Sequence, residues 1–127
     1  MIENILCAAL EKLPGMTDKV YKVSAPESEK PPYIVLGKHE ETEVQDLDGG
    51  TGFWTAELEV HLLAKDFDGL KQLEKNVKAA CRSAEGLAQN GIQVLEMRAR
   101  TAGTDEALPH LRCEHGELEV QASWREV

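Results

Sequence analysis

The sequence has few aromatic residues and no long apolar run. Phe, Trp and Tyr together make up 5% of the 127 residues. The longest apolar run covers six residues, Ile5 to Leu10, whereas a membrane-spanning helix needs about 20. We therefore expect no spanning helix. The first residues include Glu3 and no basic segment, so no signal peptide is expected either.

Basic residues are also scarce. Lys and Arg number 14 against 23 Asp and Glu, which gives a formal charge of −9. This balance argues against tight or sequence-specific binding to nucleic acid and against an anionic membrane surface, because both need a basic face. Hydrophobic residues at 42% and charged residues at 29% are typical of a folded globular domain. The length indicates one domain, residues 1–127.

The cysteines are few and widely spaced, at Cys7, Cys81 and Cys113. An odd number at such spacings does not indicate a disulfide framework. The pattern favours reduced thiols in a cytosolic setting.

Two segments have helical periodicity. Apolar residues recur at helical spacing over residues 2–13, and Pro14-Gly15 ends that pattern. Asp66 is a plausible N-cap for a second helix that runs to about Ala84. The apolar stripe of the second helix consists of Leu70, Leu73, Val77, Ala80, Cys81 and Ala84.

Four segments have strand character. Residues 33–37 form a short apolar run, and residues 53–64 alternate, with Trp54, Leu58, Val60 and Leu62 on one face. A third strand begins after Asn90-Gly91, with a bulge expected between Val94 and Leu95. Residues 117–125 alternate again, with Leu118, Val120 and Trp124 facing inward. Three loops are expected, at residues 24–32, 39–52 and 101–116.

The predicted order is helix, strand, strand, helix, strand, strand. The economical solution is an α+β fold: a single mixed or antiparallel sheet of about four strands, with the two amphipathic helices packed on one face.

The sequence predicts no catalytic, cofactor or metal site. Gly49-Gly50-Thr51-Gly52 precedes a strand rather than a helix, so it offers no helix N-terminus to a phosphate. Cys113-x-His115 with nearby His110 is the best metal candidate, but the second half-site of a zinc centre is absent. His61, between glutamates on a polar face, is more typical of a solvated cross-strand partner than of a base. The acids of residues 39–52 lack the spacing of a calcium loop.

Charge is concentrated in two places. Four cations fall on one strip of the second helix, opposite its apolar stripe: Lys71, Lys75, Lys78 and Arg82. Residues 39–52 contain five acids and no Lys or Arg. These acids are Glu40, Glu41, Glu43, Asp46 and Asp48. The basic strip is a candidate contact surface on an otherwise acidic protein.

Several short motifs, taken in their order, resemble a known family. After the first helix come Val20-Tyr21, the approach Pro32-Tyr33-Ile34-Val35, and Leu47-Asp48-Gly49 before the alternating strand. The second helix starts with Asp66-Phe67-Asp68, and the last strand ends in Trp124. Nearly the whole chain resembles the small tail completion, or tail terminator, proteins of long-tailed bacteriophages and prophages.

That resemblance implies a fold, a role and a set of partners. The fold is an α+β domain with helices packed against one sheet. The role is a structural ring, typically a hexamer, at the head-proximal end of the tail tube, where it stops polymerisation and offers a head-joining surface. The implied partners are the chain itself, the tail tube protein and a head-completion protein. The implied location is the virion tail, after assembly in the host cytoplasm.

Two other classes fit the residues. A ferredoxin-like ligand-binding or regulatory domain would show a deep apolar pocket with convergent polar groups. An enzyme with Glu or His acid–base chemistry would bring His61 or His115 within hydrogen-bond reach of a carboxylate.

Two hypotheses concern assembly. The four helix cations of one subunit are expected to face the five acids of the next, in a head-to-tail contact that can close into a ring. Residues 39–52 and 101–116 are expected to be poorly ordered in the isolated protein and ordered on assembly.

Overall fold

The computed structural model describes residues 2–104 and 114–127. Two helices and six strands occur there, in the order α1 (Ile2–Glu11), β1 (Val20–Lys22), β2 (Tyr33–Asp46), β3 (Gly49–Ala64), α2 (Phe67–Ala84), β4 (Ala88–Gln89), β5 (Ile92–Thr104) and β6 (Glu114–Glu126). None of the described helices is long and apolar enough to cross a membrane.

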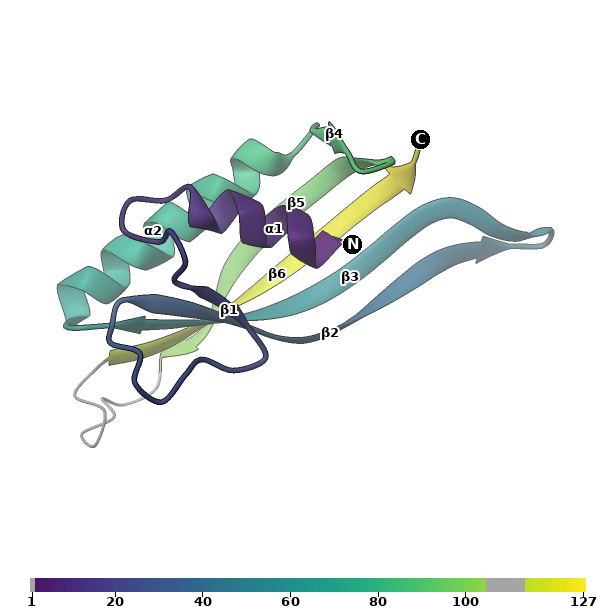
Figure 1. Cartoon of the computed structure of the whole chain (residues 1–127). Coiled ribbons are helices and arrows are strands. Elements are labelled where there is room, and N and C mark those ends of the chain that lie inside the picture. Colours follow the sequence, from purple (N-terminus) through teal and green to yellow (C-terminus); the bar gives the residue numbers. More distant parts are fainter. Residues whose placement is uncertain (1, 105–113) are drawn as a thin grey trace.

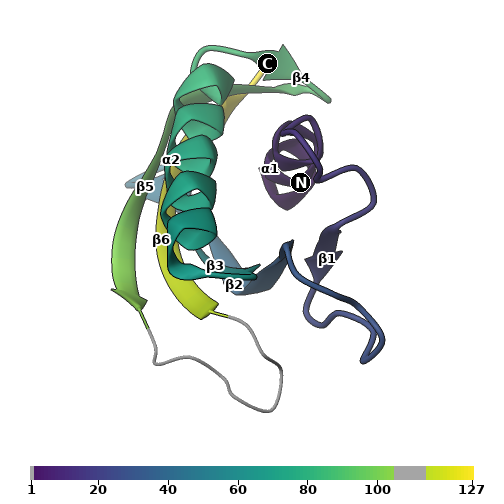
Figure 2. The same ribbon diagram turned by 90° about the vertical axis from the view of Figure 1, so that its left-hand side faces the viewer.

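The strands form one mixed sheet in the order β1-β2-β3-β6-β5-β4. β1 runs parallel to β2, and every other neighbouring pair is antiparallel. Both helices lie on the same face of the sheet, as Figure 1 shows. Figure 2 shows the sheet curling around them. The predicted α+β class and the order of the long elements are therefore correct, but about four strands was too few. The two additional strands span three and two residues, which is too short for a periodicity to be read.

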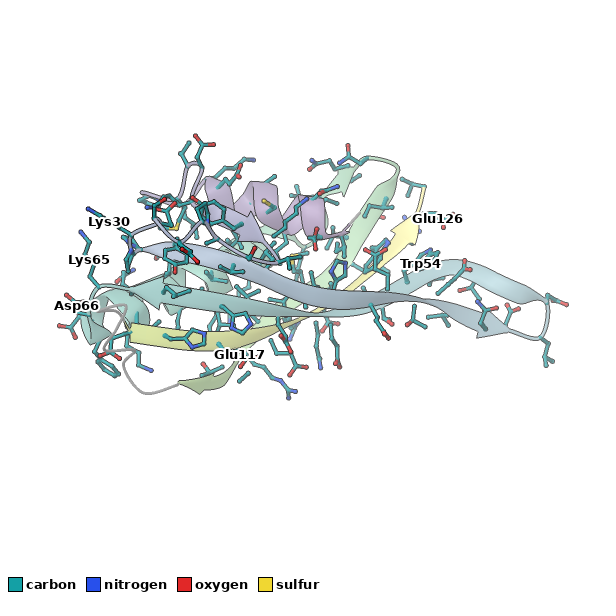
Figure 3. The ribbon with its side chains drawn as sticks, turned by 60° about the horizontal axis from the view of Figure 1, so that its bottom comes forward. Lys30, Trp54, Lys65, Asp66, Glu117 and Glu126 are labelled. Atoms are coloured by element: carbon teal, nitrogen blue, oxygen red, sulfur yellow. The ribbon has the colours of Figure 1, made fainter. Side chains whose placement is uncertain are left out.

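The core lies between the helices and the concave face of the sheet. It includes Leu6 and Leu10 of α1 and Val77 of α2, all fully buried. The predicted inward phase of the long strands is confirmed, since Leu58, Val60, Leu62, Leu118, Val120 and Trp124 are buried. Trp54, which was predicted to join them, is only half-buried. Its ring stacks on Trp124, and its Nε1 donates to Glu126 Oε1 at 2.8 Å. Figure 3 labels both partners of this hydrogen bond.

The helix ends follow local chemistry. The Asp66 carboxylate accepts a hydrogen bond from the Gly69 backbone at 2.7 Å, which confirms the predicted N-cap. α1 ends at Glu11 rather than at Leu13. The residue before a proline disfavours helical dihedrals, and two short turns, Leu13 N to Leu10 O and Met16 N to Leu13 O, follow the helix instead.

The predicted loop at residues 39–52 is wrong. These residues form the ends of β2 and β3, which pair from Tyr33↔Leu63 out to Asp46↔Gly49. The predicted loop at residues 101–116 is wrong at its ends, because residues 101–104 belong to β5 and 114–116 to β6. Its middle, residues 105–113, lies outside the described residues. The predicted bulge after Val94 is confirmed by a register shift between Val94 and Glu96.

Candidate functional site

The long β2–β3 hairpin ends in an arm, which we define as residues 43–52. On β3 only residues from Phe53 onward pair with β6, so beyond Glu43, which pairs with Trp54, the two arm strands pair only with each other. Figure 1 shows the arm projecting past the rest of the sheet. Val44 is 44% exposed and Leu47, at the tip, is fully exposed. The arm therefore exposes two apolar side chains to solvent.

A tight turn closes the arm. Asp46 pairs with Gly49 across the two-residue turn Leu47-Asp48. The Asp46 carboxylate accepts a hydrogen bond from the Asp48 backbone at 2.8 Å, and Gly49 has a φ of +109°. Such a conformation favours glycine, and the side-chain hydrogen bond shapes the turn. The Leu47-Asp48-Gly49 motif of the sequence is this turn.

The five candidate acids do not form one patch. Glu40 lies on the sheet face that carries no helix. Glu41 lies on the opposite side, where its Oε1 is 3.4 Å from the Ile2 backbone nitrogen. Glu43 accepts a hydrogen bond from the Gly52 backbone at 3.1 Å. Asp46 and Asp48 lie at the arm tip, and both are exposed. The tip thus presents two of the five carboxylates to solvent.

The four candidate cations lie together on the outer side of α2, but two of them have partners within the chain. Lys71 Nζ lies 3.6 Å from Glu74 Oε2 and 5.2 Å from the centre of the Phe67 ring. Lys78 Nζ donates to Thr101 Oγ1 at 3.2 Å. Lys75 and Arg82 are exposed, and neither has a side-chain hydrogen bond or ion pair among the described residues. These two cations are the freest of the strip.

Glu74 is an acid that the sequence pattern did not single out. It lies on the buried side of α2 with 6% of its surface exposed. Its Oε1 has no hydrogen-bond partner among the described residues. A buried carboxylate is costly unless it is paired, so Lys71 has an electrostatic role within its own chain.

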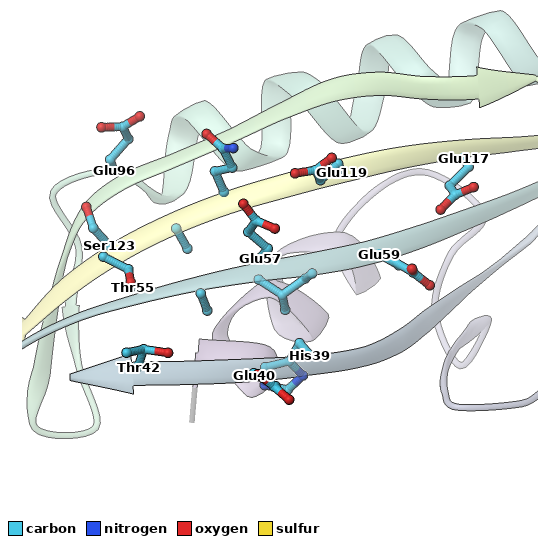
Figure 4. A pocket seen from close by; sticks show the side chains of 14 residues that line it. His39, Glu40, Thr42, Thr55, Glu57, Glu59, Glu96, Glu117, Glu119 and Ser123 are labelled. Atoms are coloured by element: carbon cyan, nitrogen blue, oxygen red, sulfur yellow. The ribbon is translucent and has the colours of Figure 1, made fainter. Parts of the chain in front are cut away.

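The face of the sheet that carries no helix is rich in glutamate. Figure 4 shows these side chains standing on adjacent strands. They line an open groove of about 1000 Å³. Six glutamates contribute to it: Glu40, Glu57, Glu59, Glu96, Glu117 and Glu119. We call this surface the open face.

Like charges oppose each other on the open face. Glu40 is in register with Glu57, and Glu59 with Glu119. Carboxylates placed directly opposite are destabilising. Arg100 partly offsets this through Glu119, at 3.0 Å. Alternation along residues 53–64 predicts a polar face with Glu57, Glu59 and His61, but not which glutamates of other strands lie beside them. The register across strands, which periodicity does not supply, is what brings them together.

Two histidines, His61 and His115, lie beside the glutamates of the open face. His61 is in register with Glu117, and its Nε2 lies 3.5 Å from Glu59 Oε2. His115 stacks on His61 with ring centroids 5.2 Å apart, and its Nε2 lies 3.1 Å from His61 Nδ1. The prediction of a cross-strand role for His61 is confirmed. Cys113 and His110, the other members of the sequence's metal candidate, lie outside the described residues.

The described thiols are poorly suited to chemistry. Cys81 is buried in α2, and this burial raises its pKa to about 12. The pKa of Cys7 is raised by partial burial and by the nearby Glu11 carboxylate. A raised pKa keeps a thiol protonated and weakly nucleophilic.

Comparison with known proteins shows what this chain is similar to. The family model described as Tail completion protein gp17 matches residues 6–123. A solved structure titled "Virion of native gene transfer agent (GTA) particle" contains a chain of similar fold, with a TM-score of 0.56 and 16% sequence identity. The match covers 95% of this chain and 84% of that one. No curated protein matches the sequence.

Proposed function

Because the chain belongs to the tail completion protein gp17 family, a family of phage tail structural components, we propose that it forms a ring on the head-proximal end of the tail tube. The ring ends tube polymerisation and provides the surface to which the head joins. Its partners are further copies of the chain, the tail tube protein and a head-completion protein. The family assignment implies a structural role rather than an enzymatic one.

The observation that carries this proposal is the one-sided construction of the fold. Both helices cover one face of the sheet, and the other face is open and bears six glutamates (Figure 4). In a ring whose inner wall is this face, the channel is acidic. Such a wall repels the phosphates of DNA, so DNA passes without being retained. The net charge of −9 per chain supports the same role.

The arm and the α2 strip supply the contact between subunits in this proposal. The arm projects from one end of the sheet, and α2 covers the concave face of the sheet together with α1 (Figure 1). The arm tip carries Asp46 and Asp48, and the strip carries Lys75 and Arg82. A contact between two different surfaces is heterologous and can close into a ring. The other candidates from the sequence contribute less to this contact, because each already has a partner within the chain or lies on the open face. They are Lys71, Lys78, Glu40, Glu41 and Glu43.

The test is assembly with the tail tube protein of the same particle. Tube protein alone should polymerise to a broad range of lengths. Addition of this chain should stop growth, and electron microscopy should show a ring at one end with the sheet on its inner wall. Unchanged tube lengths together with a chain that stays monomeric at every concentration would count against the proposal. A deep ligand pocket in a monomer would favour the alternative of a small ligand-binding domain.

A further inference from the structure

A cluster of potential metal ligands lies on β3 and β6, on the open face. Glu59 and His61 are two residues apart on β3, so their side chains point the same way. His61 is in register with Glu117 of β6. One ligand atom from each of the three residues lies within 4.8 Å of those of the other two. Figure 4 labels Glu59 and Glu117 on adjacent strands.

Neither carboxylate of this cluster, Glu59 or Glu117, pairs with a lysine or arginine in the part of the chain that the structure describes. Arg100, the nearest candidate by register, pairs with Glu119 instead. A bound cation would neutralise the two negative charges that the fold has placed side by side.

His115 sets the orientation of His61. The 3.1 Å contact joins His61 Nδ1 to His115 Nε2. When His61 carries its proton on Nδ1, it donates to His115, and its Nε2 lone pair points toward the Glu59 carboxylate 3.5 Å away. Histidines that bind metals usually donate their second ring N–H in this way, which fixes both the tautomer and the ring. His61 can thus act as a metal ligand whose ring orientation is fixed by its hydrogen bond to His115.

We propose that Glu59, His61 and Glu117 bind one divalent transition-metal ion of the zinc type, with His115 as a positioning residue. One imidazole nitrogen and two carboxylate oxygens suit Zn²⁺ or Co²⁺ and disfavour Mg²⁺, which takes oxygen ligands only and keeps its waters. Water completes the coordination. The two β3 ligands and the β6 ligand lie on neighbouring strands, so the ion cross-links β3 and β6 on the open face.

The experiment measures Zn²⁺ binding to the full-length chain without an affinity tag, in competition with a chromophoric chelator. We expect one Zn²⁺ per chain, with no displacement by millimolar Mg²⁺. His61→Ala and Glu117→Gln should each weaken binding at least tenfold. The matched control is His39→Ala, because His39 also contacts two carboxylates, Glu3 at 3.2 Å and Glu41 at 3.5 Å. This control should leave Zn²⁺ binding unchanged.

Two variants test the positioning role of His115. His115→Phe keeps a ring but removes the acceptor, and it should weaken Zn²⁺ binding by about 10- to 100-fold, the usual effect of losing an outer hydrogen-bond partner. His115→Gln restores an acceptor and should recover most of the affinity. Circular dichroism of each variant checks that the fold is retained. Equal losses of Zn²⁺ affinity in His115→Phe and His115→Gln would show that His115 does not position His61 through a hydrogen bond.

Three results would overturn the site itself. The first is a chain that binds no Zn²⁺ at micromolar concentration. The second is binding that survives both His61→Ala and Glu117→Gln. The third is binding that is lost in Cys113→Ser but kept in His61→Ala, which would assign the ion to the Cys113-x-His115 motif instead. None of these results bears on ring formation, which is measured separately by sedimentation.

Discussion

At the scale of single residues, the stability of the fold depends on the inward positions of β3. Leu58 is 1% exposed in the centre of that strand. Leu58→Ala should lower the free energy of unfolding by about 2–5 kcal/mol, through lost burial and a residual cavity. Urea unfolding measures it. Leu47→Ala, at the exposed arm tip, is the matched control and should change stability by less than about 0.5 kcal/mol. A loss of that small size at Leu58 would contradict the assigned strand phase.

Glu29 gives a residue-scale prediction for pH. A salt bridge from Lys19 and a hydrogen bond from Tyr21 lower its pKa from 4.5 to about 2. Because the pKa of Glu29 is lower in the folded chain than in the unfolded chain, the ionised carboxylate stabilises the fold at pH values above about 4.5. This contribution is lost as the pH falls from about 4.5 toward 2. Glu29→Gln should therefore be less stable than the parent at pH 6, and the gap should narrow at pH 3. Urea unfolding of the parent and of Glu29→Gln at each pH measures this difference in stability. A difference that does not change with pH would show that the ionised Glu29 carboxylate is not its cause.

At the scale of elements, the N-cap of α2 is both predicted and observed. The Asp66 carboxylate satisfies the Gly69 backbone N–H at the start of the helix. Asp66→Ala should lower the free energy of unfolding by about 0.5–2 kcal/mol, the usual cost of losing such a cap. Asp66→Asn retains an acceptor oxygen and should lose much less. Thermal or urea unfolding of the pair distinguishes them, and equal losses would show that the cap is not the cause.

The elements that sequence reasoning located are those with a repeating apolar face. α2, β3 and β6 each bury one side, so buried apolar residues recur at a regular spacing within each element. Val77 of α2, Leu58 of β3 and Val120 of β6 are examples. The arm has no such signal, because both of its sides meet solvent and its only two apolar residues, Val44 and Leu47, are exposed and do not form a repeating face. Backbone hydrogen bonds between two strands hold it, and they need no particular side chains. The same composition therefore suggested a loop.

Register explains why the histidine and glutamate cluster was not visible in the sequence. His61 and His115 are 54 residues apart, and their contact depends on the pairing of Leu63 with His115 across β3 and β6. A shift of one residue would move every side chain of β6 to the other face. The alternation of glutamates predicted an exposed face, but only the strand pairing shows which groups meet on it.

At the scale of the whole molecule, two electrostatic effects act on the proposed ring. Each chain carries a formal charge of −9, so subunits repel one another at long range. Salt screens this repulsion, with a Debye length near 10 Å at about 0.1 M, while close contacts in a partly buried interface are screened less. Moderate salt should therefore favour the ring over low salt. Sedimentation velocity at matched protein concentration and increasing salt measures this, and a ring that dissociates steadily from the lowest salt upward would contradict it.

The contact between the arm tip and α2 is testable by exchanging charges. Lys75→Glu with Arg82→Glu should weaken the ring because it sets like charges against Asp46 and Asp48 of the next subunit. Asp46→Lys with Asp48→Lys should weaken it for the same reason. The four changes together restore opposite charges and should recover assembly, which a general loss of stability would not do. The matched control, Lys12→Glu with Lys30→Glu, makes the same change in net charge at positions outside both α2 and the arm, and it should have a smaller effect. Sedimentation at one protein concentration compares all five proteins. If the combined variant assembles no better than either pair, the arm tip and α2 do not meet in the ring.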